Sequence, residues 1–124
     1  MSNLSKSNED YLETIYILSL DDKNVKSIKI ATQLNVSRPA VNKAMNELLD
    51  FGLIDKTSYS GITLTDAGRL VAEEIYGKHL VIKQFLIRIG VSEHTAEIDC
   101  CKIEHVVSDE TMRKLVETLN KFKM

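Results

Sequence analysis

This chain of 124 residues lacks the features of a membrane or secreted protein. No stretch approaches the run of about 18 apolar residues that a membrane-spanning helix requires. The polar, acidic N-terminus also lacks the basic and then apolar pattern of a secretory signal segment. We therefore expect a cytoplasmic protein with no membrane partner.

Cysteine and proline are scarce, since the chain has two cysteines and one proline. The cysteines, Cys100 and Cys101, are adjacent, and in a chain without a secretory leader such a pair is not expected to form a structural disulfide. There are no repeats, and no linker rich in glycine, proline or serine. A hydrophobic fraction of 44% at this length suits one modest domain, or a small domain with a short appendage.

Common catalytic motifs are missing as well. The sequence has no His-Glu-x-x-His motif, no nucleophile elbow and no phosphate-binding loop. We therefore expect neither an enzyme nor a small-molecule substrate. Hydrolytic turnover by the metal-loaded protein would reopen the alternative of a metalloenzyme.

Charge is distributed unevenly along the chain. The formal net charge of −2 argues against a protein that coats nucleic acid indiscriminately. Residues 26–60, however, contain five Lys or Arg residues against three acidic residues, a net charge of +2, and they form the only basic part. The asymmetry is weak, and by itself it decides little.

The first half of the sequence predicts three helices. Ser7 is a candidate N-cap for the first of them. Ser27 is a candidate cap for a short second helix over residues 28–34. Ser37 is a candidate cap for the third, where Pro39 falls in the first turn and so removes no intrahelical hydrogen bond.

The second and third helices, joined by a short turn, form a helix-turn-helix pattern. The third has an inward apolar stripe of Ala40, Val41, Ala44, Met45 and Leu48. Its other side is largely polar, with Arg38, Asn42, Lys43 and Asn46. In this motif the second helix enters the major groove of DNA, so the polar side is the candidate DNA-reading face.

A β-hairpin is predicted directly after the third helix, which Gly52 ends. Its strands, over residues 53–56 and 62–64, flank the polar turn Ser58-Tyr59-Ser60-Gly61. A hairpin in this position is the wing of a winged helix-turn-helix.

The second half of the sequence predicts only helices. A long helix extends from Thr65 to about Ile89. Two more follow over residues 93–106 and 109–121, with Ser92 and Ser108 as candidate caps. The expected fold class is therefore mainly α.

Side chains that can bind a metal ion occur in three separate segments. Cys101, Glu104 and His105 have the spacing i, i+3 and i+4, which places a thiol, a carboxylate and an imidazole on one face of a helix. The other segments contribute an acidic pair, Asp10 and Glu13, and a single histidine, His79. Sulfur, nitrogen and oxygen donors from distant segments indicate a divalent transition-metal site.

Simpler interpretations exist for several of these residues. Asp10 follows Ser7 by three positions, so it can instead complete a capping box. Glu13 can be an ordinary exposed acid, and His79 a surface or core histidine. Cys100 points about 100° away from Cys101 on a helix, and we interpret it as a small buried apolar residue.

Five segments carry a family resemblance, in order over nearly the whole chain. They are Glu9-Asp10-Tyr11-Leu12-Glu13-Thr14-Ile15-Tyr16, Val36-Ser37-Arg38-Pro39-Ala40-Val41, Leu64-Thr65-Asp66-Ala67-Gly68-Arg69, Lys78-His79 and Ile103-Glu104-His105-Val106-Val107-Ser108-Asp109-Glu110. Together they resemble the diphtheria toxin repressor family of metal-activated transcriptional repressors. The last segment is the most specific.

The resemblance implies a winged helix-turn-helix DNA-binding domain, expected at residues 1–64, and a helical metal-binding and dimerisation domain, expected at residues 65–124. It implies a short form of the family, without the SH3-like domain of longer members. The expected protein is a homodimer that binds a double-stranded DNA operator and represses genes of metal-ion homeostasis. A winged-helix regulator with a vestigial metal site is the alternative.

The resemblance also assigns ligands. Asp10, Cys101, Glu104 and His105 occupy its ligand positions, Glu13 matches a further ligand of the manganese branch, and His79 matches a ligand of both branches. The iron branch has methionine at Asp10 and cysteine at Cys101, whereas the manganese branch has aspartate and glutamate there. Fe²⁺ or Mn²⁺ is therefore the expected cofactor, with Co²⁺, Ni²⁺ or Zn²⁺ as substitutes, and the thiolate favours Fe²⁺ over Mn²⁺.

The chain departs from the iron branch at the second metal site of that branch. Lys83 stands where that branch has a glutamate, and Glu97 where it has a histidine. A complete second site of that kind is therefore not expected. His79 then either joins the main site or holds a second ion loosely.

The candidate DNA contacts lie in the basic middle of the chain. Arg38, Pro39 and Asn42 are expected at base edges. Six further residues are expected mainly to position the protein on phosphates: Lys26, Ser27, Lys29, Ser37, Lys43 and Lys56. A solvated helix face is the alternative interpretation of the same polar side chains.

Overall fold

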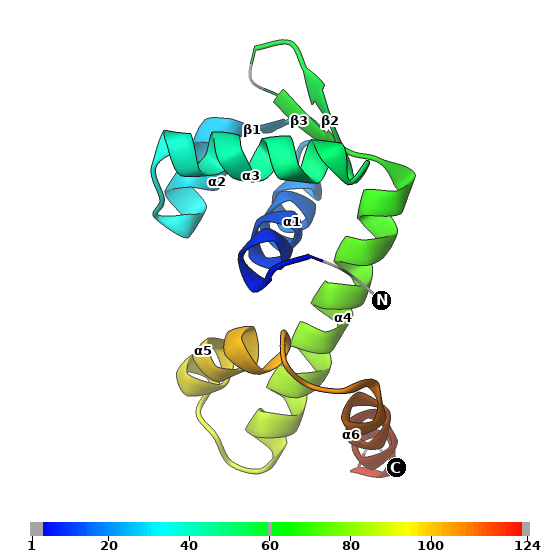
Figure 1. Ribbon diagram of the computed structural model, residues 1–124. Coiled ribbons are helices and arrows are strands. Elements are labelled where there is room, and N and C mark those ends of the chain that lie inside the picture. The colour runs from blue at the N-terminus through cyan, green and yellow to red at the C-terminus, as the bar shows by residue number, and fades with distance from the viewer. Residues whose placement is uncertain (1–3, 60, 123–124) are drawn as a thin grey trace. The chain divides into compact units, whose positions relative to one another are not determined.

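The structure is a computed structural model that describes residues 4–59 and 61–122 (Figure 1). The chain divides into two compact units, an N-terminal unit of residues 1–73 and a C-terminal unit of residues 74–124. The division falls inside the helix α4 (Asp66–Arg88). The predicted boundary between residues 64 and 65 separates two expected functions, and it differs from the boundary at residues 73 and 74 that the packing gives.

The N-terminal unit is a winged helix-turn-helix, as the sequence predicts. Its elements are α1 (Lys6–Ser19), β1 (Val25–Lys26), α2 (Ser27–Leu34), α3 (Arg38–Asp50), β2 (Ile54–Thr57) and β3 (Gly61–Leu64), followed by the beginning of α4. Leu12, Ile30 and Leu48 are completely buried at the centre of this unit. The apolar stripes of all three helices therefore meet in one core.

Two of the predicted helix caps in this unit are wrong. Ser5, not Ser7, caps α1, because its hydroxyl accepts the N–H of Asn8 at 3.1 Å while Ser7 is already helical. Ser27 is the first residue of α2, and the capping position is held by Lys26, which belongs to β1 and makes no side-chain capping bond. The adjoining strand, rather than a cap, thus determines where α2 begins.

The turn between α2 and α3 is set by two residues. Asn35 adopts a left-handed conformation with φ 54°, which asparagine tolerates better than most residues, and ends α2. Ser37 then caps α3 by accepting the N–H of Ala40 at 3.2 Å, so this predicted cap is confirmed. Gly52, with φ 75°, follows the end of α3 as the sequence predicts.

The wing is part of a three-stranded antiparallel sheet in the order β1-β3-β2. The predicted hairpin of β2 and β3 is confirmed, although Ser60 in its turn lies outside the described residues. The sequence did not predict β1, whose Val25 pairs with Ile62 of β3. Thr57 of β2 donates a hydrogen bond to Asn24 at 2.6 Å, which ties the hairpin to the segment before β1.

The C-terminal unit contains the rest of α4, α5 (Glu93–Ile103) and α6 (Asp109–Phe122). The predicted caps are confirmed, because Ser92 and Ser108 accept the N–H groups of Thr95 and Thr111 at 3.3 and 3.2 Å. The mainly α fold is confirmed as well. No helix in the described part of the chain is long and apolar enough to cross a membrane.

The C-terminal end of α5 differs from the prediction. The helix predicted over residues 93–106 ends at Ile103, and Glu104 is its C-cap. Glu104 and His105 therefore project from a turn rather than from a regular helix. Because Glu104 keeps right-handed helical dihedral angles, its side chain still follows the direction of α5.

Candidate metal centre and nucleic-acid interface

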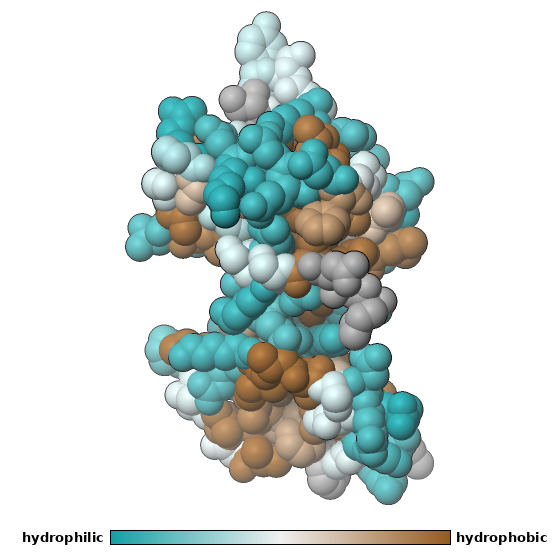
Figure 2. Space-filling model, in the orientation of Figure 1, coloured by the Kyte–Doolittle hydropathy of each residue, from teal (hydrophilic) through white to brown (hydrophobic). Residues whose placement is uncertain are grey.

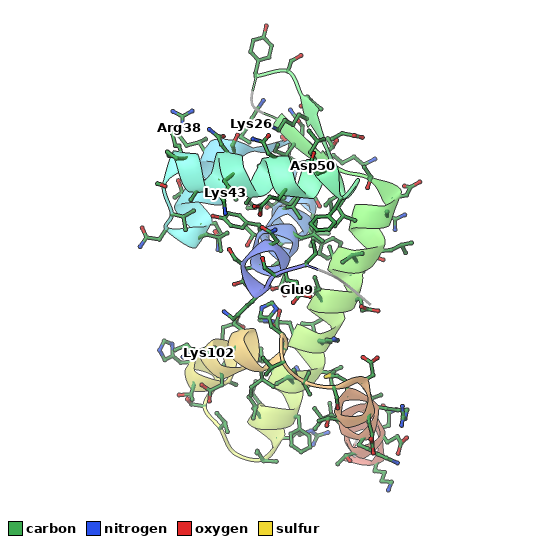
Figure 3. All side chains as sticks on the ribbon, in the orientation of Figure 1. Glu9, Lys26, Arg38, Lys43, Asp50 and Lys102 are labelled. Atoms are coloured by element: carbon green, nitrogen blue, oxygen red, sulfur yellow. The ribbon has the colours of Figure 1, made fainter. Side chains whose placement is uncertain are left out.

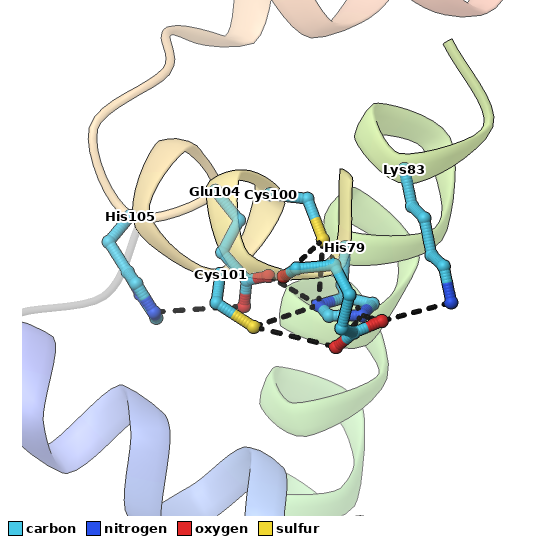
Figure 4. Close-up of polar contacts among 7 residues, drawn as sticks. His79, Lys83, Cys100, Cys101, Glu104 and His105 are labelled. Carbon is cyan, nitrogen blue, oxygen red and sulfur yellow. Dashed lines mark hydrogen bonds and ion pairs between the residues drawn. The ribbon is translucent and has the colours of Figure 1, made fainter. Parts of the chain in front are cut away.

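His79 of α4 lies at the centre of a polar cluster in the C-terminal unit (Figure 4). Its Nδ1 atom is 2.7 Å from Oε1 of Glu104, and its Nε2 atom is 3.1 Å from Oε2 of Glu97. The ring of Tyr76 stacks on the imidazole, with centroids 5.9 Å apart. The imidazole is thus fixed by a carboxylate on each side and an aromatic ring.

Glu97 of α5 is held between two basic groups. Its Oε1 atom is 3.0 Å from Nζ of Lys83, while its other oxygen faces His79. Partial burial alone would raise the pKa of Glu97, but the hydrogen bond from Lys83 and the attraction of His79 together lower it. Glu97 is therefore a carboxylate, and one of its oxygens points into the cluster.

The two adjacent cysteines both face the same cluster. Sγ of Cys100 is 3.5 Å and 3.6 Å from the two ring nitrogens of His79. Sγ of Cys101 is 3.9 Å from Nδ1 of His79 and 3.6 Å from Oε2 of Glu97. Burial and neighbouring negative charge raise the pKa of Cys100 to about 11 and that of Cys101 to about 12. Both thiols are therefore protonated at neutral pH.

Glu104 shows that the cluster suits a cation. Its side chain is fully buried, and Oε1 is used by His79. Oε2 accepts no hydrogen bond from any residue in the described part of the chain, and lies 3.7 Å from Nε2 of His105. A buried carboxylate oxygen without a hydrogen bond costs free energy unless positive charge meets it. The donor set of carboxylate, imidazole and thiol accordingly fits a divalent transition metal.

The structure thus brings together three of the predicted ligands, His79, Cys101 and Glu104, with His105 adjacent to Glu104. Asp10 and Glu13 belong to α1 of the N-terminal unit, so their place in the ligand set stays a prediction. The alternative of a capping box at Asp10 is wrong, since Ser5 caps α1. Asp10 instead forms an ion pair of 3.7 Å with Lys6.

Two members of the cluster, Glu97 and Cys100, were not predicted as ligands: Glu97 was placed at a second-site position of the iron branch, and Cys100 was interpreted as a core residue. Cys100 is buried as expected, and it packs in a small apolar core with Ile82 and Met112. Its sulfur nevertheless also faces His79. The signal was present, because Glu97, Cys100 and Cys101 repeat the spacing i, i+3 and i+4 of the predicted ligands.

The outer face of α3 is the candidate DNA-reading surface. Arg38, Pro39, Asn42 and Lys43 are exposed, whereas Val41, Ala44, Met45 and Leu48 are buried. Arg38 and Asp50 mark the two ends of this helix, with Lys43 between them (Figure 3). The space-filling view shows a hydrophilic surface over α3 (Figure 2). The predicted division of the helix into two sides is therefore confirmed.

The other predicted phosphate contacts lie around this helix. Lys56 of β2 donates a hydrogen bond of 2.6 Å to Oδ1 of Asn46 on α3, so the wing is linked to the helix. Lys29 is exposed on α2, and Ser37 is exposed at the start of α3. Lys26 and Ser27 are half-buried where β1 meets α2.

A hydrogen-bonded pair connects α1 to α3. Oε1 of Glu47 accepts a hydrogen bond from Nδ2 of Asn8 at 2.9 Å, and Oε2 lies 3.5 Å from Nζ of Lys43. The hydrogen bond from Asn8 and the charge of Lys43 lower the pKa of Glu47. One carboxylate thus contacts α1 and a candidate DNA-binding lysine.

Comparison with known proteins is consistent with both parts of this arrangement. Residues 3–62 match the family model described as iron dependent repressor, N-terminal DNA binding domain. Residues 65–124 match the model described as iron dependent repressor, metal binding and dimerisation domain. Together the two models cover nearly the whole sequence.

Individual relatives range from the length of this chain to about twice that length. An uncharacterised HTH-type transcriptional regulator of Methanocaldococcus jannaschii is 38% identical over 122 residues, which cover 97% of this chain and 98% of that protein. The transcriptional regulator MntR of Escherichia coli is 35% identical over 84% of this chain and 67% of its own length. The solved manganese regulator SloR superposes with a TM-score of 0.81 at 34% identity, over 91% of this chain and 53% of that chain. The chain thus spans about half of SloR.

Proposed function

Given that this chain belongs to the iron-dependent repressor family, we propose that it is a metal-dependent DNA-binding transcriptional repressor of metal-homeostasis genes. The observation that carries the proposal is the buried cluster around His79, where an imidazole, carboxylates and thiols face one another. Such a cluster can bind a divalent ion, and the same chain has a winged helix-turn-helix for binding DNA. Metal binding and DNA binding can therefore be coupled.

The proposed cofactor is Fe²⁺ or Mn²⁺, for which Co²⁺, Ni²⁺ or Zn²⁺ can substitute. The proposed ligands are Asp10, Glu13, His79, Cys101, Glu104 and His105. The carboxylates in this set repel one another when no cation is bound. A bound ion supplies the positive charge that removes this repulsion, and so links metal binding to the arrangement of the DNA-binding helices. The role proposed for this chain is regulatory rather than enzymatic.

The proposed partner is a double-stranded DNA operator. Arg38, Pro39 and Asn42 are proposed to contact base edges, because they are exposed at the beginning of the helix that enters the major groove in this motif. The proposed phosphate contacts are Lys26, Ser27, Lys29, Ser37, Lys43 and Lys56. We assign DNA binding to residues 1–64, and metal binding and dimerisation to residues 65–124.

The proposed assembly is a homodimer formed through the C-terminal unit. Hydrophobic surface gathers between α5 and α6 in this unit (Figure 2). Exposed large apolar side chains of the unit include Ile87, Ile89, Ile98 and Val106. Apolar surface of this kind is typical of an interface between subunits. Because the proposed partner is operator DNA, we propose the cytoplasm as the location.

The central experiment measures operator affinity with and without metal. Duplexes that bind would be selected from a random pool with the Mn²⁺- or Fe²⁺-loaded protein, the latter under anaerobic conditions. Removing the metal with a chelator is expected to weaken binding by roughly 5- to 150-fold. Equal affinity in both states would instead support a winged-helix regulator with a vestigial metal site.

The DNA surface has its own test. Lys56→Ala should weaken binding to all duplexes by a similar factor and reduce the slope of log affinity against log salt by about 1, because one phosphate contact is lost. Lys102→Ala, on the exposed surface of α5, is the matched control and should leave the slope unchanged. An unchanged slope for Lys56→Ala would remove this lysine from the interface.

A further inference from the structure

Four side chains of the C-terminal unit that could hold a metal ion lie close together. His79, Glu97, Cys100 and Cys101 each offer one ligand atom, and these atoms all lie within 4.8 Å of one another. The histidine comes from α4 and the other three residues from α5. The set contains two thiols, and two of its members, Glu97 and Cys100, are outside the proposed Fe²⁺ or Mn²⁺ ligands.

Three distances within this set are close to those of a tetrahedral site. A Zn²⁺ ion held at about 2.0–2.3 Å by nitrogen, oxygen and sulfur separates neighbouring donors by about 3.3–3.8 Å. Nε2 of His79 is 3.6 Å from Sγ of Cys100 and 3.1 Å from Oε2 of Glu97. Sγ of Cys101 is 3.6 Å from the same Oε2 atom. Because all four ligand atoms lie within 4.8 Å of one another, shifts of about 1 Å bring them to the spacing that one ion requires.

The surrounding side chains already hold these donors in place. Nδ1 of His79 lies 2.7 Å from Oε1 of Glu104, so this nitrogen can donate to Glu104 while Nε2, which faces Glu97 and Cys100, binds the ion. Lys83 holds Oε1 of Glu97, so Oε2 stays directed at the cluster. A ligand histidine whose other nitrogen donates to a carboxylate is the usual arrangement in metal sites. The outer contacts of a metal site are therefore present.

We propose that His79, Glu97, Cys100 and Cys101 form a thiol-rich site for a soft divalent cation such as Zn²⁺. Two thiolates and an imidazole favour Zn²⁺ over the harder Mn²⁺, which prefers carboxylate ligands. Each cysteine that binds gives up its proton to the solution, so one bound ion releases two protons. The inference deepens the proposed function and rests on metal binding in the C-terminal unit. It adds that this unit has two overlapping ligand sets, which share His79 and Cys101.

The number of sulfur ligands tests the proposal. X-ray absorption would be recorded on the reduced full-length protein with one equivalent of Zn²⁺. Two sulfur ligands at about 2.3 Å are expected in the unaltered chain, and one in Cys100→Ser. His94→Ala removes an exposed histidine of the same helix and should keep two. One sulfur in the unaltered chain, or an unchanged count in Cys100→Ser, would overturn the proposal.

A second variant covers the risk that serine disturbs the small core around Cys100. Cys100→Ala keeps that position apolar and should likewise leave one sulfur ligand. Glu97→Gln should lower Zn²⁺ affinity by at least about tenfold, yet leave Mn²⁺ affinity unchanged, because Glu97 belongs to one ligand set only. An equal loss for both ions would contradict the existence of two sets.

The outcomes separate this inference from the proposed function. Two sulfur ligands in a protein whose DNA affinity ignores every metal would overturn the repressor proposal and leave the thiol-rich site standing. One sulfur ligand in a protein whose DNA affinity follows metal would do the reverse.

Discussion

The N-terminal unit has the larger apolar core, whereas the smaller core of the C-terminal unit adjoins a cluster of ionisable side chains. Of the eight largest fully buried side chains in the described residues, seven belong to the N-terminal unit, and the eighth is Cys100. The C-terminal unit instead buries His79 and Glu104, two groups that need partners. Hydrophobic burial therefore stabilises both units, and the stability of the second also depends on how the His79 cluster is satisfied.

The largest expected effect lies in the apolar interior. Leu48→Ala should lower the free energy of unfolding by about 2–5 kcal/mol, because it leaves a cavity among fully buried side chains. Leu49→Ala is the matched control, since Leu49 is 38% exposed on the same helix. Urea unfolding measures both. Similar losses for the two variants would show that the N-terminal core is less closely packed than described.

The next prediction concerns the polar interior. The raised pKa values of Cys100 and Cys101, about 11 and about 12 instead of 9.0, mean that folding favours the neutral thiols. Their contribution to stability is present below pH 9 and is lost as the pH rises toward those values. At pH 8 without metal, alkylation by iodoacetamide should be roughly 100-fold slower in the folded protein than in urea. Equal rates would place the thiols in solvent.

A metal ion should sharpen the contrast between the units. At tenfold excess over its dissociation constant, Zn²⁺ or Mn²⁺ should add about 1.4 kcal/mol of stability where it binds. Hydrogen exchange should then slow in α5 and change little in α2, which contributes no predicted ligand. Uniform protection of both helices would mean that the units are not separately stabilised.

The smallest effect concerns a helix end. Ser5→Ala should cost about 1 kcal/mol, because the N–H of Asn8 loses its acceptor. Ser7→Ala, two residues later in the first turn of α1, should stay within about 0.5 kcal/mol. Thermal unfolding of the two variants distinguishes the observed cap from the one that the sequence suggests.

Local signals explain why most of the fold is predictable from the sequence. Ser37, Ser92 and Ser108 cap helices as expected, since capping depends only on residues within one turn. The two-residue strand β1 was missed because two residues show no alternation. It forms through pairing with β3, a partner more than 30 positions away in the sequence. Its formation in turn moved the start of α2.

The candidate site is less predictable for the same reason. The spacing of Cys101, Glu104 and His105 is local and could be recognised, but the contact between His79 and Glu104 joins residues 25 positions apart. The sequence pattern predicts Cys100 as a core residue, and in the structure its side chain is indeed buried. Burial does not say what a side chain faces, and only the packing of α4 against α5 reveals that its sulfur meets an imidazole.

The two contacts of Glu47 limit how such a regulator can change over evolutionary time. It contacts Asn8 on the helix that carries two predicted ligands and Lys43 on the helix proposed to read DNA. A substitution here would alter both helices together, so operator preference and metal response are not independently adjustable at this position. New operator preferences should therefore arise more readily at Arg38 or Asn42, whose side chains are exposed on the outer face of α3.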